Sequence, residues 1–346
     1  MRNLIYILLV ILTISCNNTN YVPIEYFDDD LSNENLNEEI INTASFTELT
    51  KWPNNIINTY PNPNDIIEWG KEPILGIKKL HEEGITGKNI NVAIIDGPFN
   101  SNHQEFSNKT IEIINIGNFN LPALHGTIVT SILSGKNVGI APDINLFYFA
   151  ESTNIISGYK NKIMALRKIF EYNQENDNKI QIVSISIGKV KELNYFEEYL
   201  SEIKKLEKTG VMVFHLAMKP RIFAGLEYEL LSDRSDYQNL KNNSLTSGLI
   251  GKLRMFLFYR KSILLPWADY TVAHSENNSS YMFIGKSSWG FSWTVPIVSG
   301  MAALALQVNG ELTKDEILAN ILESGIKHNG SVIPNMDEFI SLCKNK

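Results

Sequence analysis

Three side chains, far apart in the chain, have the types that a nucleophilic triad needs. They are the carboxylate of Asp96, the imidazole of His125 and the hydroxyl of Ser292, each inside an otherwise apolar, glycine-punctuated segment. An imidazole that is oriented by a carboxylate can take the proton of a hydroxyl and so make its oxygen a nucleophile. The order Asp, His, Ser is one of the known chain orders of such triads. If the three side chains converge in space, they predict a serine hydrolase.

The elements that must position these residues are apolar strands alternating with amphipathic helices. The expected strands are 91–95, 145–149, 182–187 and 211–216. The expected helices are 125–134, 159–173, 195–208, 292–307 and 314–323. Near-continuous apolar strands between helices indicate a mainly parallel sheet that is covered on both faces. The predicted fold class is therefore α/β, doubly wound, with residues 219–265 as an irregular or inserted region.

Each triad candidate also has an ordinary structural explanation when taken alone. Asp96 ends a buried strand, which suits a ligand-facing carboxylate but equally a helix cap or a loop acid. His125 stands at a helix start, where an isolated histidine is more often a solvated or satisfied imidazole. Ser292 precedes a helix with Pro296 in its first turn, the usual place of an N-cap serine. The same place also suits a nucleophile, because helix amides face a developing oxyanion.

Taken together, the segments resemble the subtilisin family of serine proteases. The resemblance rests on Ile-Ile-Asp96-Gly with His103-Gln-Glu-Phe106, on His125-Gly-Thr followed by Val138-Gly-Ile-Ala-Pro142, and on Gly290-Phe-Ser292-Trp-Thr-Val-Pro296. It extends from about Trp69 to Lys327. The resemblance implies a serine endopeptidase that acts on polypeptide substrates. In it Ser292 attacks the scissile carbonyl, His125 carries the proton and Asp96 orients the imidazole.

The resemblance also implies a substrate-binding strand and an oxyanion site. The segment Ser184-Ile-Ser186-Ile187-Gly188 is similar to the strand that pairs with substrate backbone, although a plain core strand explains the same residues. At the position of the family's oxyanion asparagine this chain has Lys219. We expect Lys219 to supply a charged donor instead, so that Lys219→Met slows hydrolysis; an exposed loop lysine is the alternative.

Bulky aromatic residues flank the candidate nucleophile, unlike in the family. Phe291 and Trp293 adjoin Ser292, and Trp289 lies nearby. These side chains are expected to narrow the pocket. They favour a second hypothesis, in which the chain is a catalytically weak or inactive subtilase-fold lipoprotein that binds peptides or proteins at a surface.

The N-terminus resembles an export signal of a bacterial lipoprotein. Leu4 to Ile14 is an apolar run shorter than the about 20 residues that a bilayer span needs. Leu12-Thr-Ile-Ser-Cys16 is similar to a loose lipobox, with Cys16 as the lipid-bearing residue; an ordinary cleaved signal peptide is the alternative. We therefore expect a signal peptide over 1–15, an acidic and polar tether over 16–68, and a peptidase domain over 69–346. The expected location is a bacterial membrane, on its periplasmic or cell-surface face.

Composition and charge exclude several other classes. The net charge is −7, from 31 basic and 38 acidic residues, and no basic cluster suggests nucleic acid as a partner. The sequence His81-Glu-Glu lacks the second histidine of a zinc-helix motif, so no metal site is assigned. Structural calcium is common in the family, but no acidic loop here is assigned to it. No cofactor is therefore expected.

Overall fold

The protein is described by a computed structural model, which covers residues 24–117, 123–151, 159–188, 194–242, 248, 253, 261–288 and 290–345. Its centre is a five-stranded parallel sheet with the strand order β4-β5-β3-β6-β7. These strands span Ile111–Asn115 (β4), Asn145–Ala150 (β5), Asn91–Asp96 (β3), Ile182–Ile185 (β6) and Met212–His215 (β7). The expected α/β fold with a parallel sheet is confirmed.

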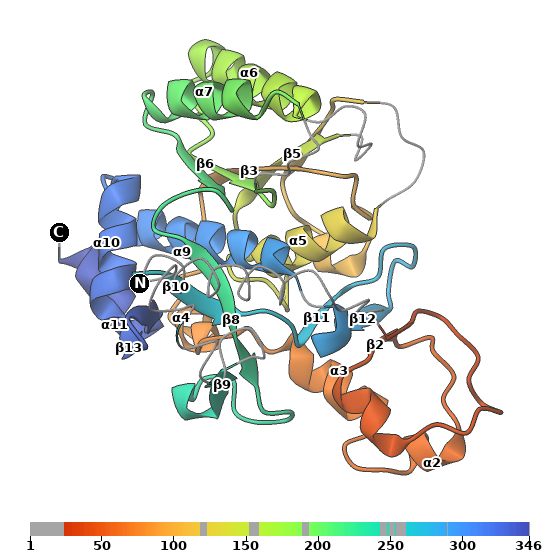
Figure 1. Ribbon diagram of the computed structural model, residues 1–346. Coiled ribbons are helices and arrows are strands. Elements are labelled where there is room, and N and C mark those ends of the chain that lie inside the picture. The colour runs from red at the N-terminus through yellow and green to blue at the C-terminus, as the bar shows by residue number, and fades with distance from the viewer. Residues whose placement is uncertain are drawn as a thin grey trace, which may run out of the picture.

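Helices cover both faces of this sheet, as Figure 1 shows. On one face lie α6 (Lys160–Glu175) and α7 (Phe196–Glu207), which pack on one set of alternating strand side chains. On the other face lie α5 (Leu124–Ser134) and α9 (Thr294–Val308), which contact the opposite set. The helices and strands expected from sequence are confirmed, with ends that differ by two residues at most. Of the five strands of this sheet, β4 was not expected from sequence.

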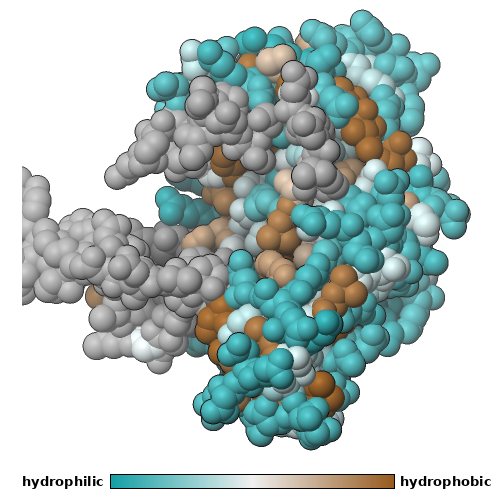
Figure 2. Space-filling model, turned by 90° about the vertical axis from the view of Figure 1, so that its right-hand side faces the viewer, coloured by the Kyte–Doolittle hydropathy of each residue, from teal (hydrophilic) through white to brown (hydrophobic). Residues whose placement is uncertain are grey.

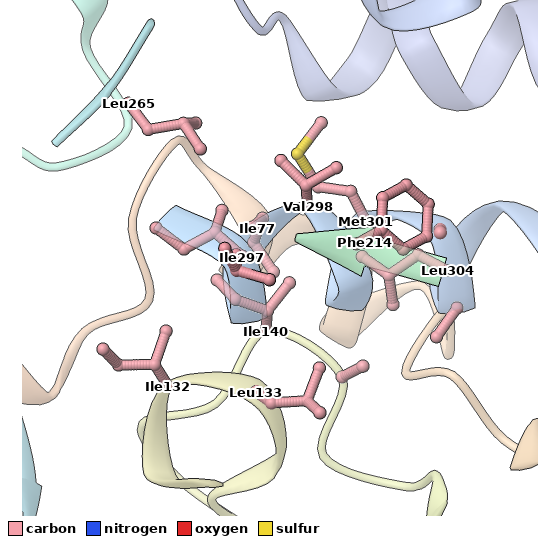
Figure 3. Packing of buried hydrophobic residues seen from close by; sticks show 14 of the residues in the cluster. Ile77, Ile132, Leu133, Ile140, Phe214, Leu265, Ile297, Val298, Met301 and Leu304 are labelled. Carbon is pink, nitrogen blue, oxygen red and sulfur yellow. The ribbon is translucent and has the colours of Figure 1, made fainter. Parts of the chain in front are cut away.

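The deepest core surrounds α9. Figure 3 shows Val298 and Met301 of this helix beside Phe214 of β7. Ile140 and two residues of α5, Ile132 and Leu133, lie on the other side of α9 in the same cluster. The helical stretch Phe291–Val308 is long and apolar enough to cross a membrane, but 78% of it is buried inside the protein. An apolar helix with that much burial is the central core helix of this fold.

The C-terminal half adds a second sheet with the order β13-β14-β10-β8-β9. Its strands are Ile326–His328 (β13), Ser331–Ile333 (β14), Ile263–Pro266 (β10), Ile222–Tyr228 (β8) and Leu240–Asn242 (β9). The helices nearby are α4 (Ile77–Glu82), α10 (Lys314–Ser324) and α11 (Met336–Lys344). Because β8 pairs with β10 over its first residues, the expectation that 219–265 is irregular is wrong for its two ends.

The expected tether is also wrong for residues 24–68, the part of that segment that the structure describes. These residues form β1 (Glu25–Tyr26), a 3-10 turn at Glu38–Asn42, β2 (Ser45–Thr47), α2 (Asn54–Ile57) and the first residues of α3 (Pro63–Lys71). The strand β2 joins β12 (Tyr281–Ile284), which pairs with β11 (Tyr270–Ala273). The segment is therefore an integral part of a four-stranded sheet.

A small hydrophobic cluster explains why this segment folds. Phe46 and Ile56 are fully buried, and the edge of the Trp52 ring packs against Phe46 with 5.3 Å between centroids. The many Asn, Asp and Glu residues of the segment lie on its outer surface, consistent with the largely hydrophilic face in Figure 2. Cys16 and the expected signal peptide lie outside the described residues.

Candidate active site

Asp96 and His125 meet at the carboxyl-terminal edge of the central sheet. Asp96 is the last residue of β3, and His125 is the second residue of α5. His125 Nδ1 lies 2.8 Å from Asp96 Oδ1, and the same oxygen accepts the backbone N–H of Gly97 at 2.8 Å. The side chain of Asp96 is 8% exposed and that of His125 is 38% exposed. The carboxylate is thus buried and fixed, while the imidazole reaches solvent.

A glycine allows this contact. A Cβ atom on Gly126 would lie 2.7 Å from the Tyr148 hydroxyl and 2.8 Å from the Pro98 carbonyl, and it would also collide with the Gly97 carbonyl. Real Cβ contacts are longer than this, so only glycine lets the first turn of α5 approach the chain that follows Asp96. The His-Gly pair in the sequence is therefore a packing requirement as well as a chemical one.

Burial and charge act in opposite directions on His125. Burial lowers the pKa of the imidazole, but the charge of Asp96 and its hydrogen bond outweigh this, so the pKa of His125 is raised from 6.5; Lys162 opposes the rise. Because Nδ1–H donates to Asp96, the neutral ring presents the lone pair of Nε2 to the opposite side. That nitrogen is the one that can accept a proton from a nucleophile.

Ser292 lies in a 3-10 turn, Phe291–Trp293, that leads directly into α9. Its hydroxyl donates to the Ser186 carbonyl at 3.3 Å, and the Ser186 hydroxyl donates to the Ser292 carbonyl at 2.9 Å. The two serines thus join the nucleophile turn to the end of β6. In the described part of the chain, Ser292 makes no hydrogen bond to His125.

Trp293 connects the nucleophile turn to the imidazole. Its ring centroid is 5.2 Å from that of His125, with 39° between the planes, and its Nε1 donates to the Ser288 carbonyl at 3.3 Å. The indole also fills the space over Gly290, where a Cβ would lie 2.8 Å from the ring. The expected aromatic neighbour is therefore in place. Phe291 packs instead toward Trp267 and Ala268, and Trp289 lies outside the described residues.

Only part of the predicted substrate-binding strand, residues 184–188, lies near Ser292. Ser184 is 2% exposed inside β6 and is a residue of the sheet core. Residues 186–188 follow the last pairing of β6 with β3, which is Ile94 with Ser184. Leu216 N donates to the Ile187 carbonyl at 3.1 Å, and the Tyr159 hydroxyl donates to the Gly188 carbonyl at 2.5 Å.

In the described structure, no hydrogen bond joins Lys219 to Ser292. Lys219 is exposed and lines a groove of about 670 Å³ together with residues 310–315, which follow the C-terminal end of α9. Ser292 precedes the opposite end of this helix, whose 15 residues span about 22 Å. No contact supports an oxyanion role for Lys219, so that role stays a prediction. The backbone N–H of Ser292, in the turn that leads into α9, is the remaining donor, because the N–H groups of Trp293 and Thr294 bond to the carbonyls of Gly290 and Phe291.

Sequence analysis missed two charged residues beside the triad, Glu151 and Lys162. Glu151 directly follows β5, as Asp96 ends β3, and this parallel was the one signal in the sequence. No signal in the sequence pointed to Lys162, because a lysine near the start of a helix is usually solvated. Among the described residues, no group of three or more His, Cys, Asp or Glu side chains is arranged to hold a metal ion.

The chain is similar in sequence to a known serine protease. The chain is 23% identical over 270 residues to the major intracellular serine protease of Bacillus subtilis (strain 168), covering 72% of this chain and 80% of the relative. No protein-family model matches the chain.

Solved structures share the fold over most of this chain. The prenylagaramide maturation protease PagA superposes with a TM-score of 0.54 and 20% identity, covering 78% of this chain and 99% of PagA. The PatG macrocyclase in complex with peptide also superposes with a TM-score of 0.54. Its sequence identity is 14%, and the match covers 79% of this chain and 97% of the PatG chain. The fold is subtilisin-like. The chain is a homologue of a subtilisin-like serine protease, and its Asp96, His125 and Ser292 lie at the carboxyl edge of this subtilisin-like sheet.

Proposed function

We propose that the chain is a serine endopeptidase that hydrolyses peptide bonds through Asp96, His125 and Ser292. The observation that carries the proposal is the 2.8 Å contact between a buried carboxylate and a part-exposed imidazole. That imidazole also lies against Trp293, the residue that follows Ser292. The homology to a serine protease supports the same assignment.

The chemistry follows from the orientation of the imidazole. Ser292 Oγ leaves the Ser186 carbonyl and attacks the substrate carbonyl carbon, while His125 Nε2 takes the hydroxyl proton. The C–N bond then breaks as His125 returns this proton to the departing amine, leaving an acyl group on Ser292. Water, deprotonated by the same nitrogen, attacks the acyl carbon and restores the hydroxyl. Asp96 holds the Nδ1–H tautomer and stabilises the imidazolium throughout.

Stabilisation of the oxyanion depends on the backbone in this proposal. The N–H of Ser292 and the N-terminal end of α9 face the charge that develops on the substrate oxygen. A side-chain amide donor is absent from the expected position, and loss of one such donor typically costs about 10²–10³ in rate. We therefore expect a working but slow enzyme.

Polypeptides are the proposed substrates, bound in extended form along residues 186–188. Ser186 is hydrogen-bonded to Ser292, and residues 186–188 follow the last pairing of β6 with β3, so a substrate strand can pair with them there. The PatG relative is described in complex with a peptide, which agrees with this mode of use.

Membrane attachment is a separate part of the proposal and rests on the sequence alone. We propose that Cys16 is lipidated and that the enzyme faces the periplasm or the cell exterior. Expression of Cys16→Ala beside wild type, followed by membrane fractionation, tests this. The variant is expected in the soluble fraction, and equal membrane retention of both proteins would contradict the anchor.

The competing hypothesis is a peptide-binding protein without catalysis, which the Ser292–Ser186 hydrogen bond and the absent amide donor favour. Incubation of purified protein with an internally quenched peptide library, analysed by mass spectrometry, separates the two. The proposal predicts cleavage products with wild type and none with Ser292→Ala. Peptide binding by both proteins without any cleavage would replace the proposal by the alternative.

A further inference from the structure

An indole ring lies against the imidazole of His125, and the mechanism above gives this ring no role. Trp293 is 7% exposed, and its ring centroid is 5.2 Å from that of His125, with 39° between the planes. Among the described residues, it is the one aromatic ring in contact with His125. Trp293 directly follows Ser292, so one short turn carries both the proposed nucleophile and the ring that contacts the base.

Contacts on its other sides fix the indole in place. Its Nε1–H donates to the Ser288 carbonyl at 3.3 Å, and the backbone N–H of Trp293 donates to the Gly290 carbonyl at 3.3 Å. Gly290 also leaves room for the ring, because a Cβ atom there would lie 2.8 Å from Cε2 of the indole. The turn itself packs on α5, the helix of His125. The separation of the two rings is therefore set by the backbone and not by a freely rotating side chain.

Charged groups from other elements also act on His125. Burial lowers the pKa of His125, whereas the charge and hydrogen bond of Asp96, from β3, raise it, and Lys162, from α6, lowers it. Lys162 is itself paired with Glu151, which follows β5. Tyr148, from β5, is uncharged at neutral pH, since burial raises its pKa well above 10. The turn that precedes α9 has no charged side chain, so its ring acts on the imidazolium through the π face.

The ring contact favours one protonation state of His125 over the other. A cation within about 6 Å of an aromatic centroid is attracted by the negative face of the ring, and tryptophan attracts it most strongly. The attraction is larger where water is excluded, as it is around the buried Trp293. A neutral imidazole gains only stacking and dispersion. Because His125 is protonated between attack on the substrate and departure of the amine, the contact stabilises a state that the proposed reaction must pass through.

We propose that Trp293 is a positioning residue that stabilises protonated His125 through its indole face and holds the imidazole beside Ser292. The indole neither gives nor takes a proton: the proton moves from Ser292 Oγ to His125 Nε2 and then to the departing amine. In the described structure the Ser292 hydroxyl donates to the Ser186 carbonyl, so the ring contact joins the nucleophile turn to the base. The catalytic meaning of the contact rests on the proposed protease function, but its effect on the imidazole does not.

A purely structural role of the indole predicts the opposite change in the pKa of His125. If the indole only covers the imidazole, its removal admits water and raises this pKa. If the indole acts as proposed, the pKa falls when an apolar side chain without a π face replaces it. NMR titration of His125 in Ser292→Ala protein measures this, with the signal assigned by its loss in His125→Asn. We expect Trp293→Met to lower the pKa by about 0.4–1 units and Trp293→Phe to lower it by less, since a phenyl ring keeps a weaker π face.

The matched control is Trp52→Met, which removes a similarly buried indole that packs against Phe46 and contacts no histidine among the described residues. It should leave the pKa of His125 unchanged. A pKa in Trp293→Met that equals or exceeds that of the parent would overturn the proposal. Equal pKa values in Trp293→Met and Trp293→Phe would overturn it too, because the two side chains differ chiefly in the π face.

Tryptophan fluorescence of the parent tests the contact without any change to Trp293. A protonated imidazole in contact with an indole quenches its emission, so the emission should fall as the pH is lowered through the pKa of His125. This step should be absent in His125→Asn, and identical pH profiles of the two proteins would contradict the contact. Thermal unfolding of each variant is measured first. If Trp293→Met does not fold, the fluorescence step still decides.

The catalytic part of the proposal is tested with Ser292 intact. The acid limb of the pH dependence of kcat/KM reports the pKa of the base in the free enzyme. In Trp293→Met this limb should move to lower pH by the same amount as the NMR pKa, which a loss of packing alone would not produce. A limb that stays in place would overturn this part. A changed pKa of His125 with no peptide hydrolysis by the wild-type protein would instead refute the protease function and leave the effect of the indole standing.

Discussion

Asp96 and His125 are already in contact and are held by tight packing, whereas the hydroxyl of Ser292 is hydrogen-bonded to a group other than His125. On the first side, β3 and α5 meet at Gly126, which leaves no room for a Cβ, and the imidazole and carboxylate are 2.8 Å apart. On the second side, the Ser292 hydroxyl donates to the Ser186 carbonyl. The base is therefore assembled before substrate binds, and the nucleophile must still turn toward it. This difference predicts that changes on the Asp96 side have the larger effects.

The largest effect is expected from Asp96→Asn. The amide cannot hold the Nδ1–H tautomer or stabilise the imidazolium, so kcat should fall about 10⁴-fold with the fold intact. Hydrolysis of a fluorogenic peptide measures this, with Asp143→Asn as a control for an exposed aspartate that also flanks a strand. A loss below about 10-fold would show that the Asp96–His125 contact is not the working base.

The next effect is expected from Gly126→Ala. The added methyl group meets the Gly97 and Pro98 carbonyls and the Tyr148 hydroxyl, none of which is the free end of a flexible side chain. Overpacking of this kind typically costs about 1–3 kcal/mol in the free energy of unfolding, and it displaces His125 as well. Thermal unfolding and peptide hydrolysis should both decline. Gly310→Ala is the control, because its Cβ would be 3.9 Å from its nearest neighbour; equal behaviour of the two variants would contradict the packing argument.

A smaller effect is expected on the Ser292 side from Ser186→Ala. This variant removes the hydrogen bond from the Ser186 hydroxyl to the Ser292 carbonyl but leaves the backbone carbonyl that accepts from Ser292. One such bond contributes about 0.5–1.5 kcal/mol, so kcat/KM should fall by about tenfold or less. A loss of kcat/KM as large as that expected for Asp96→Asn would contradict the difference between the Asp96–His125 pair and Ser292.

The smallest effect is expected from Lys219→Met. Its position in the groove with residues 310–315 gives it no contact with Ser292, so kcat should change by less than about twofold. The sequence alone predicted a sharp loss, and measurement of kcat decides between the two. A drop of about 10²-fold or more would restore Lys219 as an oxyanion donor and overturn its assignment to the groove.

The sequence predicted the elements whose signal is local and left out those whose partners are distant. Apolar runs such as 145–149 specify a buried strand by themselves, and the segments around Asp96, His125 and Ser292 specify a family of sites. The folding of residues 24–68 could not be predicted in this way. Its few apolar residues, such as Phe46 and Ile56, are spaced irregularly among Asn, Asp and Glu, and they become a core only against β12.

The same limit applies to the candidate site. Lys219 was assigned by its resemblance to a family position, but the structure places it in the groove with residues 310–315. Glu151 and Lys162 are separated by ten residues, and only the fold shows that they pair beside Asp96. Local composition reveals which residues have suitable chemistry, and tertiary packing decides which of them meet.

The measurement that tests the central claim most directly is labelling of the purified protein with a fluorophosphonate probe. This reagent reacts with a serine whose hydroxyl is deprotonated by a neighbouring base, so it reports the assembled Asp96–His125–Ser292 unit without requiring a good substrate. The account predicts one adduct, on Ser292 by peptide mapping, that is lost in Ser292→Ala and strongly slowed in His125→Ala. A folded wild-type protein that remains unlabelled, or that labels equally in His125→Ala, would contradict it.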